Sequence, residues 1–253
     1  MLLFLPPSET KREGGDGAPL DLRTLSFPEL SRLRSELVDR VIELSQDEPA
    51  ALKALKLGPR LVNEVEHDRR LRVSPTMPAL DRFTGVLFDA LDAGTLDAAA
   101  RDFAAETTFV HSALFGLVGA LDAIPAYRLS HDSRVPGVAL RRYWRDAVSA
   151  LLDAHDGVIV DLRSEAYADL GPAPIRDGSV FVRVVSIDGD GRRRALNHFN
   201  KQAKGRFARR FLETRPAVAS IDDLLAWAKD EGFELTPGAA ASARAPRELE
   251  LVA

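Results

Sequence analysis

The chain has 253 residues, of which 45% are hydrophobic and 28% are charged, and its formal net charge is -4. This composition is ordinary for a globular protein and argues against a surface coated in positive charge. Cysteine is absent, which excludes disulfides and cysteine-based metal sites and is compatible with a reducing cytosol. No segment approaches about 20 continuous apolar residues, so we expect a cytoplasmic protein that does not span a membrane.

The first half of the chain predicts one strand followed by several helices. A short apolar strand is ended by Pro6-Pro7, because proline cannot continue a hydrogen-bonded ladder. Ser26 is placed to cap the first helix, with Glu29 three residues later as in a capping box. The expected elements are a strand at 2–5, a loop at 11–19, and helices from 26, from 49 with a break at Gly58-Pro59, and over most of 79–123.

The second half alternates helices with strands. The expected elements are helices at 138–154, 200–214 and 220–231, and strands at 157–162, 180–185 and 195–199, the last two joined by a hairpin at 188–191. This order predicts one compact α/β (mixed α+β) domain over residues 1–236, with a small central mixed sheet surrounded by helices. Residues 237–253 are rich in Ala, Ser and Pro and predict a loosely held tail.

Similar polar residues follow two of the predicted strands. The first strand runs into Ser8-Glu9-Thr10-Lys11, and the strand at 157–162 runs into Arg163-Ser164-Glu165-Ala166-Tyr167. Ligands of open α/β sheets bind beyond the carboxyl ends of strands, which makes both segments candidate binding sites. Capped turns without a ligand are the alternative, because Ser is common in turns for backbone reasons. The spacing Ser8-x-x-Lys11 also occurs in serine acyl-enzymes, but their partner motifs are absent.

The helix predicted at 200–214 carries lysines beside its apolar stripe. That stripe consists of Ala203, Phe207 and Phe211. Lys204 falls on the apolar side of the helix and Lys201 lies close to that side, whereas Arg206 lies away from the apolar stripe. A lysine that points toward a core is costly unless its amino group reaches an anion or water. The pattern favours an anion-binding or catalytic role for Lys204, with snorkelling along the surface as the alternative.

Residues 52–62 resemble a helix-hairpin-helix element. In such elements a tight turn points backbone N–H groups at a DNA phosphate, and Leu57-Gly58-Pro59-Arg60 fits its second half. Lys56 replaces the usual first glycine of the hairpin. We expect Gly58 and Arg60 to contact DNA; an ordinary joint between two helices is the alternative. The histidines show no metal-ligand spacing, and Walker A and GxGxxG motifs are absent, so we expect no metal and no cofactor.

Several stretches of the chain occur together in an order and spacing that is specific to one family. They are Leu3-Phe-Leu-Pro-Pro-Ser-Glu-Thr-Lys11, Phe83-Thr-Gly85-Val-Leu-Phe88, Leu114-Phe-Gly116-Leu-Val-Gly-Ala-Leu-Asp122, Pro125-Ala-Tyr127-Arg128-Leu129, Tyr143-Trp144, Asp161-Leu-Arg-Ser164-Glu-Ala-Tyr167 and Asn200-Lys201-Gln-Ala-Lys204-Gly205-Arg206. Through them the chain resembles the YaaA (peroxide stress resistance, formerly UPF0246) family over nearly its whole length.

The resemblance implies a compact single-domain α/β fold with a positively lined cleft. It also implies DNA binding, with a helix-hairpin-helix element near residues 52–66. The implied role is resistance to hydrogen peroxide by limiting free intracellular iron and oxidative DNA damage. Many members carry Ala-Arg-Gly where this chain has Ala203-Lys204-Gly205. The positive charge is kept at this position, but planar bidentate binding of a phosphate is lost.

Two functional hypotheses follow. The first is a stress protein that binds double-stranded DNA without sequence preference, through the excess of Lys and Arg over residues 183–215. The second is an enzyme acting on a nucleobase, nucleoside or other small anionic substrate. Its candidate catalytic residues are Lys204 as base or anion clamp, Asp161 as orienter or acid, and Ser8. The candidate anion- or DNA-binding residues are Lys11, Arg128, Ser164, Tyr167, Lys201, Arg206, Gly58 and Arg60. A third alternative is a protein that handles iron or binds a partner and catalyses no reaction.

Overall fold

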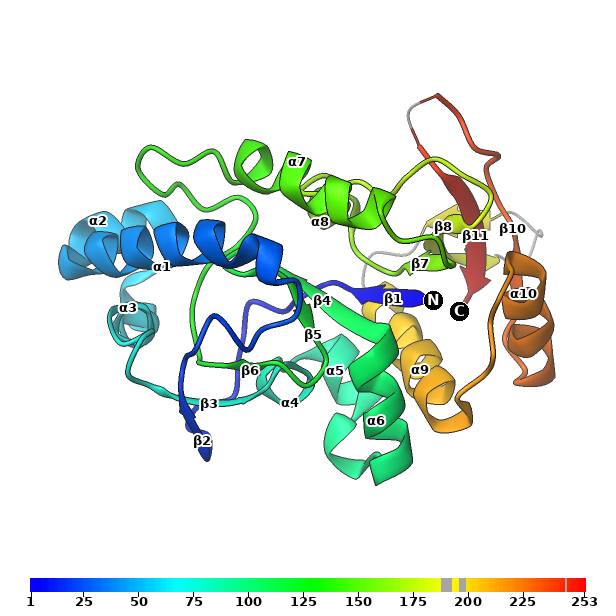
Figure 1. Cartoon of the computed structure of the whole chain (residues 1–253), viewed down its shortest axis with the longest axis horizontal. Coiled ribbons are helices and arrows are strands. Elements are labelled where there is room, and N and C mark those ends of the chain that lie inside the picture. Colours follow the sequence, from blue (N-terminus) through cyan, green and yellow to red (C-terminus); the bar gives the residue numbers. More distant parts are fainter. Residues whose placement is uncertain (188–192, 196–198, 244) are drawn as a thin grey trace.

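The structure is a computed structural model that describes residues 1–187, 193–195, 199–243 and 245–253. Its centre is a mixed eight-stranded sheet with the strand order β10-β11-β8-β7-β1-β4-β5, in which β9 pairs with β8. The strands are β1 (Leu2–Leu5), β4 (Thr108–Ser112), β5 (Gly116–Gly119), β7 (Ile159–Asp161), β8 (Ser179–Ile187), β9 (Arg193–Ala195), β10 (Leu235–Pro237) and β11 (Arg247–Val252). Figure 1 shows α7 (Leu140–Asp153) on one face of this sheet and α6 (Ala98–Thr107) and α9 (Phe199–Thr214) on the other. The compact α/β fold predicted from the sequence is therefore confirmed.

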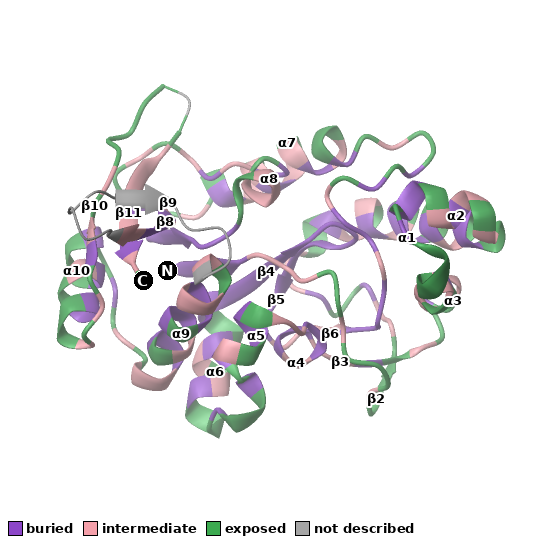
Figure 2. Cartoon of the chain, turned by 180° about the vertical axis from the view of Figure 1, so that it is seen from behind, coloured by how far each residue is buried: buried purple, intermediate pink, exposed green. Residues whose placement is uncertain are grey.

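Burial follows from this layered arrangement. All four residues of β1 are buried, since the strand lies in the middle of the sheet with helices on both faces. Figure 2 shows the same pattern across the molecule, with buried residues along the central strands and exposed residues on the outer sides of the helices. A strand covered on both faces needs a continuous apolar run, which is what Leu2–Leu5 provides.

The remaining elements surround this sheet. A small second sheet has the order β2-β3-β6 and consists of β2 (Gly17–Pro19), β3 (Pro75–Pro78) and β6 (Ala123–Ile124). The other helices are α1 (Ser31–Gln46), α2 (Glu48–Leu55), α3 (Val62–Arg69), α4 (Ala79–Arg82), α5 (Val86–Leu91), α8 (Glu165–Ala168) and α10 (Ile221–Asp230), with 3-10 turns η1 (Pro28–Leu30), η2 (Pro59–Leu61) and η3 (Ala93–Thr95). No helix in the described part of the chain is both long enough and apolar enough to cross a membrane.

Parallel pairing brings the two predicted site loops together. β1 pairs in parallel with β7, with Phe4 opposite Asp161 in the register. The Leu162 N–H donates to the Phe4 carbonyl oxygen at 2.8 Å, which continues the pairing past the end of β7. The loops that follow these neighbouring strands therefore leave the sheet side by side, at its carboxyl edge.

Two local predictions differ from the structure, and a third lies outside the described residues. Residues 108–119 were expected to be helical but form β4 and β5, because a short apolar run buried on both faces shows no helical or strand period. Ser26 does not cap a helix; its hydroxyl donates to Asp122 at 2.9 Å, and α1 begins only at Ser31 after a left-handed Phe27. The predicted hairpin turn at 188–191 lies outside the described residues, although β8 and β9 pair antiparallel as expected.

The C-terminal segment is held far more firmly than its composition predicts. Residues 247–252 form β11, which pairs in parallel with β8, and Leu249 and Leu251 are buried. The prediction of a loosely held tail over 237–253 is therefore wrong for this strand. The alternation of Glu and Leu at 248–251 is a strand pattern. The preceding Ala-, Ser- and Pro-rich residues obscured it.

Candidate functional site

A cavity of about 470 Å³ lies beyond the carboxyl ends of β1 and β7, and we call it the Lys204 cavity. Its lining comes from the loop after β1, a loop at 130–131, the turn into α8 and the first turns of α9. The lining residues are Pro6, Pro7, Ser8, Glu9, Thr10, Ser130, His131, Ser164, Tyr167, Asn200, Lys201 and Lys204. The structure thus brings together the predicted candidates Ser8, Ser164, Tyr167, Lys201 and Lys204.

Lys204 is placed by the packing of α9. Phe207 and Phe211 are fully buried one and two turns further along the helix. Gly205 lets α9 approach α5 closely, because a Cβ at that position would lie 2.2 Å from the Leu87 carbonyl oxygen. Lys204 is consequently only 4% exposed, as its place on the apolar side predicts.

The amino group of Lys204 is held by few polar partners. Its Nζ donates to the Arg163 carbonyl oxygen at 3.2 Å and lies 5.5 Å from the centroid of the Phe181 ring. Burial lowers the pKa of Lys204 to about 8, with Asp161 opposing this fall and Arg183 adding to it. A fraction of the lysine is therefore neutral near pH 7, and a bound anion would restore its charge.

Hydroxyl groups form another part of the cavity wall. The Ser8 hydroxyl lies 3.2 Å from that of Thr10, and the Thr84 hydroxyl donates to Thr10 at 2.9 Å. Gly85, with a φ of +95°, borders the same group; a Cβ there would lie 3.3 Å from the Ser8 oxygen. Thr84 and Gly85 were not among the predicted site residues. In the sequence, Thr84 and Gly85 were indicated only by the stretch Phe83–Phe88, which the family shares.

A stacked pair of rings forms an aromatic wall. The imidazole of His131 and the ring of Tyr167 lie nearly parallel, at 9°, with centroids 5.2 Å apart. Burial raises the pKa of Tyr167 to about 12, so its hydroxyl is neutral at physiological pH. His131, Ser130 and Asn200 line the cavity but were missed by sequence analysis. A histidine without a metal-ligand spacing gives no local signal, because its position here depends on long-range packing.

Lys11 and Arg128 lie beside the cavity lining without belonging to it. Arg128 forms an ion pair of 2.5 Å with Glu9, which does line the cavity. The Lys11 Nζ lies 4.0 Å from the centroid of the Tyr127 ring and donates to the Glu9 carbonyl oxygen at 3.1 Å. Burial, assisted by Arg128, lowers the pKa of Lys11 to about 7. Both cations therefore support the loop that carries Ser8 and Glu9.

Asp68 is a buried acid behind this loop that sequence analysis missed. One carboxylate oxygen accepts from the Arg128 backbone N–H at 2.8 Å, and the other has no hydrogen-bond partner among the described residues. Burial raises the pKa of Asp68 to about 8, while Lys11 acts in the opposite direction. Asp68 comes from α3, so it links the helix pair α2–α3 to the segment that contains Arg128.

Asp161 is held by a salt bridge and faces a different cavity. Its carboxylate lies 2.6 Å from Arg163, whose side chain is fully buried. Arg163 also donates to the His111 Nδ1 at 2.7 Å and to the Gly171 carbonyl oxygen at 3.0 Å. The structure does not bring Asp161 into the lining of the Lys204 cavity, and its charge is already balanced by Arg163.

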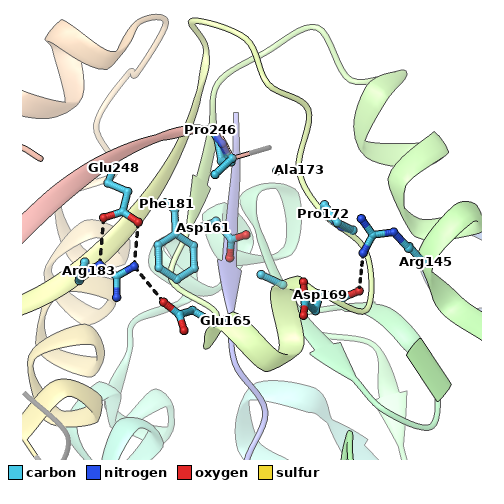
Figure 3. Close-up of a pocket in the computed structure, with 12 residues that line it drawn as sticks. Arg145, Asp161, Glu165, Asp169, Pro172, Ala173, Phe181, Arg183, Pro246 and Glu248 are labelled. Carbon is cyan, nitrogen blue, oxygen red and sulfur yellow. Dashed lines mark hydrogen bonds and ion pairs between the residues drawn. The ribbon is translucent and has the colours of Figure 1, made fainter. Parts of the chain in front are cut away.

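The second cavity, of about 210 Å³, lies on the other side of the Glu165 turn. Figure 3 shows Arg183 between Glu248 and Glu165. Glu248 receives two hydrogen bonds from Arg183, of 2.9 and 2.8 Å, and Glu165 receives one of 2.9 Å. Asp161 and Phe181 also line this cavity. The charges on this side are therefore largely paired within the protein.

The helix-hairpin-helix-like segment lies apart from the cavity lining. α2 ends at Leu55 and is followed by Lys56, which adopts a left-handed conformation with a φ of 57°; Pro59 starts the short turn η2 before α3. The Lys56 amino group pairs with Asp132 at 2.5 Å, next to the loop that carries His131. Gly58 and Arg60 are exposed, as is Arg206 on α9. These three predicted contacts do not line the Lys204 cavity.

No group of three or more His, Cys, Asp or Glu side chains that could hold a metal ion is found in the described part of the chain. The polar and aromatic groups that line the Lys204 cavity are instead lysines, hydroxyls, an amide, aromatic rings and the carboxylate of Glu9, which is paired with Arg128. Lysine and hydroxyl donors are the groups that proteins use to bind phosphate and carboxylate. The arrangement can therefore bind an anion.

Comparison with known proteins gives a consistent family match. The model of a family described as peroxide stress protein YaaA matches residues 1–239. A UPF0246 protein of Corynebacterium efficiens is 45% identical over 225 residues, which cover 87% of this chain and 88% of that protein. A UPF0246 protein of Streptomyces coelicolor is 38% identical over 256 residues, which cover 100% of this chain and 98% of that protein.

Proposed function

Because the chain belongs to the peroxide stress protein YaaA family, we propose that it serves the peroxide stress response by binding duplex DNA through its phosphates. The observation that carries this proposal is the buried amino group of Lys204, which opens on a cavity and has no ion pair with any described carboxylate. A buried ammonium is unfavourable unless an anion compensates it. A phosphate oxygen supplies that compensation.

Further cations on the same helix and on the α2–α3 turn support the proposal. Lys201 lines the cavity and is exposed, and Arg206 is exposed on the next turn of α9. Arg60 and the backbone of Gly58 are exposed where α2 leads into α3. Contacts of this kind are to the phosphate backbone, which carries no sequence information, so binding is proposed to be independent of sequence.

Duplex DNA affinity measured over a series of salt concentrations tests the proposal. Each phosphate contact contributes a slope of about -0.9 in log K against log salt, so the wild-type affinity falls steeply with salt. Lys204→Met is expected to weaken binding about tenfold or more, because it removes a desolvated charge–phosphate contact. Lys229→Met, an exposed lysine on α10, is the matched control and leaves binding unchanged. Absence of duplex binding even at low salt refutes the proposal.

A role in limiting free intracellular iron, and with it oxidative DNA damage, is part of the same proposal and rests on the family resemblance. Free iron and peroxide survival measured in cells that lack the protein test this part. Complementation with the wild-type chain is expected to restore low free iron and survival. If free iron is the same with and without the protein, the iron role fails while DNA binding can still stand.

A second candidate function is favoured by the lowered pKa of Lys204, about 8. An amine with a pKa near the working pH suits a general base, and the Ser8 hydroxyl lines the same cavity. We therefore also propose an enzyme that acts on a small anionic substrate. A metabolite screen with wild type and Lys204→Met in parallel tests it. A compound consumed by wild type and untouched by the variant supports the enzyme, and identical behaviour of the two chains opposes it.

A further inference from the structure

The Lys204 cavity presents two chemically different walls. The first turns of α9 provide Asn200, Lys201 and Lys204, which are donors and cations. The second wall is planar and largely apolar, and it consists of the stacked rings of His131 and Tyr167. Pro6 and Pro7, which follow β1, add further apolar surface. A ligand that satisfies both walls must combine an anionic group with a planar ring.

The ring pair is held in place before any ligand arrives. His131 and Tyr167 lie at 9° to each other, and His131 is 32% exposed at its side chain. The loop that carries His131 is fixed by the Ser130 hydroxyl, which donates to Asp132 at 2.8 Å, and by the Lys56–Asp132 ion pair. An aromatic surface fixed in this way stacks a further ring at a low entropic cost.

The size of the cavity also restricts the ligand. Cavities of about 300–1,000 Å³ hold ligands of the size of a drug molecule, and this one measures about 470 Å³. The remaining lining residues are Glu9, whose carboxylate pairs with Arg128, and four residues with hydroxyl groups, Ser8, Thr10, Ser130 and Ser164. Hydroxyls both donate and accept, which suits the edge of a heterocycle or the oxygens of a sugar.

We propose that the Lys204 cavity binds one nucleotide, with its phosphate at Lys204 and its base against the His131–Tyr167 rings. The inference deepens the proposed function and rests on the same anion site. A free mononucleotide and an unpaired nucleotide within a DNA strand share this chemistry. A Watson–Crick paired nucleotide does not, since its base is stacked inside the duplex and is not available to the aromatic wall.

Calorimetric titration with three related ligands tests the two walls separately. Adenosine monophosphate carries both groups, ribose 5-phosphate lacks the base, and adenosine lacks the phosphate. Adenosine monophosphate is expected to bind roughly 5- to 150-fold more tightly than ribose 5-phosphate, the usual range for stacking one base. Equal affinity of these two ligands overturns the inference, because the base then contributes nothing.

Variants assign each part of the ligand to its wall. His131→Ala is expected to reduce the affinity for adenosine monophosphate to that for ribose 5-phosphate, while leaving ribose 5-phosphate unaffected. His131→Phe keeps a planar ring and is expected to retain binding. Lys204→Met is expected to weaken both phosphate ligands. If His131→Ala weakens both ligands equally, the ring is merely structural and the inference is wrong.

Binding to three DNA duplexes shows whether the ligand is a free mononucleotide or an unpaired nucleotide within a DNA strand. The three are a fully paired duplex, the same duplex with one unpaired adenosine, and the same duplex with an abasic sugar at that position. Tighter binding of the unpaired adenosine that is lost in His131→Ala identifies a nucleotide of DNA as the ligand. Equal binding of all three duplexes, together with tight binding of adenosine monophosphate, identifies a free nucleotide.

The failure of the inference and the failure of DNA binding are distinguishable. If all three duplexes bind equally and adenosine monophosphate binds no better than ribose 5-phosphate, the nucleotide site is refuted while DNA binding stands. If no duplex binds but adenosine monophosphate binds in a manner that depends on His131 and Lys204, the nucleotide site stands and DNA binding is refuted.

Discussion

Two buried cations lie near the end of β7, and they differ in what surrounds them. Arg163 is fully buried and is neutralised by Asp161, with further contacts to His111 and to the Gly171 carbonyl oxygen. Lys204 is 4% exposed, and its described hydrogen bond is to the backbone carbonyl oxygen of Arg163. Both charges lose their hydration on burial. Arg163 recovers the loss through a direct ion pair, whereas Lys204 has only the longer-range attraction of Asp161 and Glu165. A paired buried charge fixes the structure, whereas a buried charge without an ion pair beside a cavity is suited to bind a ligand.

The largest expected effect is on the paired cation. Arg163→Met leaves the Asp161 carboxylate buried without a partner, and breaking such a pair costs about 3–5 kcal/mol of unfolding free energy. Urea unfolding monitored by the tryptophan residues measures the change. Adding Asp161→Asn to this variant is expected to recover part of the loss, since the unpaired charge is then gone. Arg141→Met, which removes an arginine side chain that is 64% exposed, is expected to change stability by less than about 0.5 kcal/mol. An equal loss in Arg141→Met would contradict the comparison.

A second variant moves Lys204 without changing its charge. Gly205→Ala places a Cβ 2.2 Å from the Leu87 carbonyl oxygen, so α9 must shift away from α5. Overpacking of this kind costs about 1–3 kcal/mol, and the shift also displaces Lys204 from the cavity. The measurements are urea unfolding and duplex DNA affinity. Gly94→Ala is the matched control, because a Cβ there meets nothing within 4 Å, and it leaves both quantities unchanged. Normal DNA binding by Gly205→Ala would show that the position of Lys204 does not matter.

The pH dependence of anion binding is expected to follow Lys204. Burial lowers the pKa of Lys204 to about 8, and only the protonated form binds an anion strongly. The affinity of the wild type for duplex DNA therefore falls as the pH rises from 7 to 9. Lys204→Arg keeps the charge at residue 204 throughout this range, so its affinity is expected to fall less than that of the wild type. Lys11 and Asp68 are shifted into the same range but are common to both chains, so only the difference between the chains is assigned to residue 204.

The smallest effect is expected for an exposed cation. Arg60 lies on the α2–α3 turn and contacts solvent, so its removal does not disturb the protein core. Arg60→Ala is expected to weaken duplex binding a few-fold and to lower the magnitude of the salt slope by about 1, the signature of one lost phosphate contact. A salt slope identical to that of the wild type would mean that this turn does not touch DNA.

Local patterns predicted the parts of the site that depend on neighbouring residues in the chain. The apolar runs at the two parallel strands indicated where their loops would leave the sheet, and the helical period placed Lys204 on the buried side of α9. His131 and Asp68 could not be found in this way. Each reaches its position through contacts with residues far away in the sequence, such as Tyr167 and the Arg128 backbone. The pairing of Asp161 with Arg163 was missed because a salt bridge two residues apart depends on the backbone turn after β7.

The central claim is that Lys204 is a buried charge kept for a ligand and not for stability. Unfolding free energy and duplex DNA affinity measured on the same preparations of wild type and Lys204→Met test it most directly. The variant is predicted to be as stable as the wild type or more stable, because a buried cation without an ion pair is replaced by an apolar side chain of similar length. A loss of affinity of about tenfold or more is also predicted. A variant that is less stable but binds DNA with unchanged affinity would contradict the account.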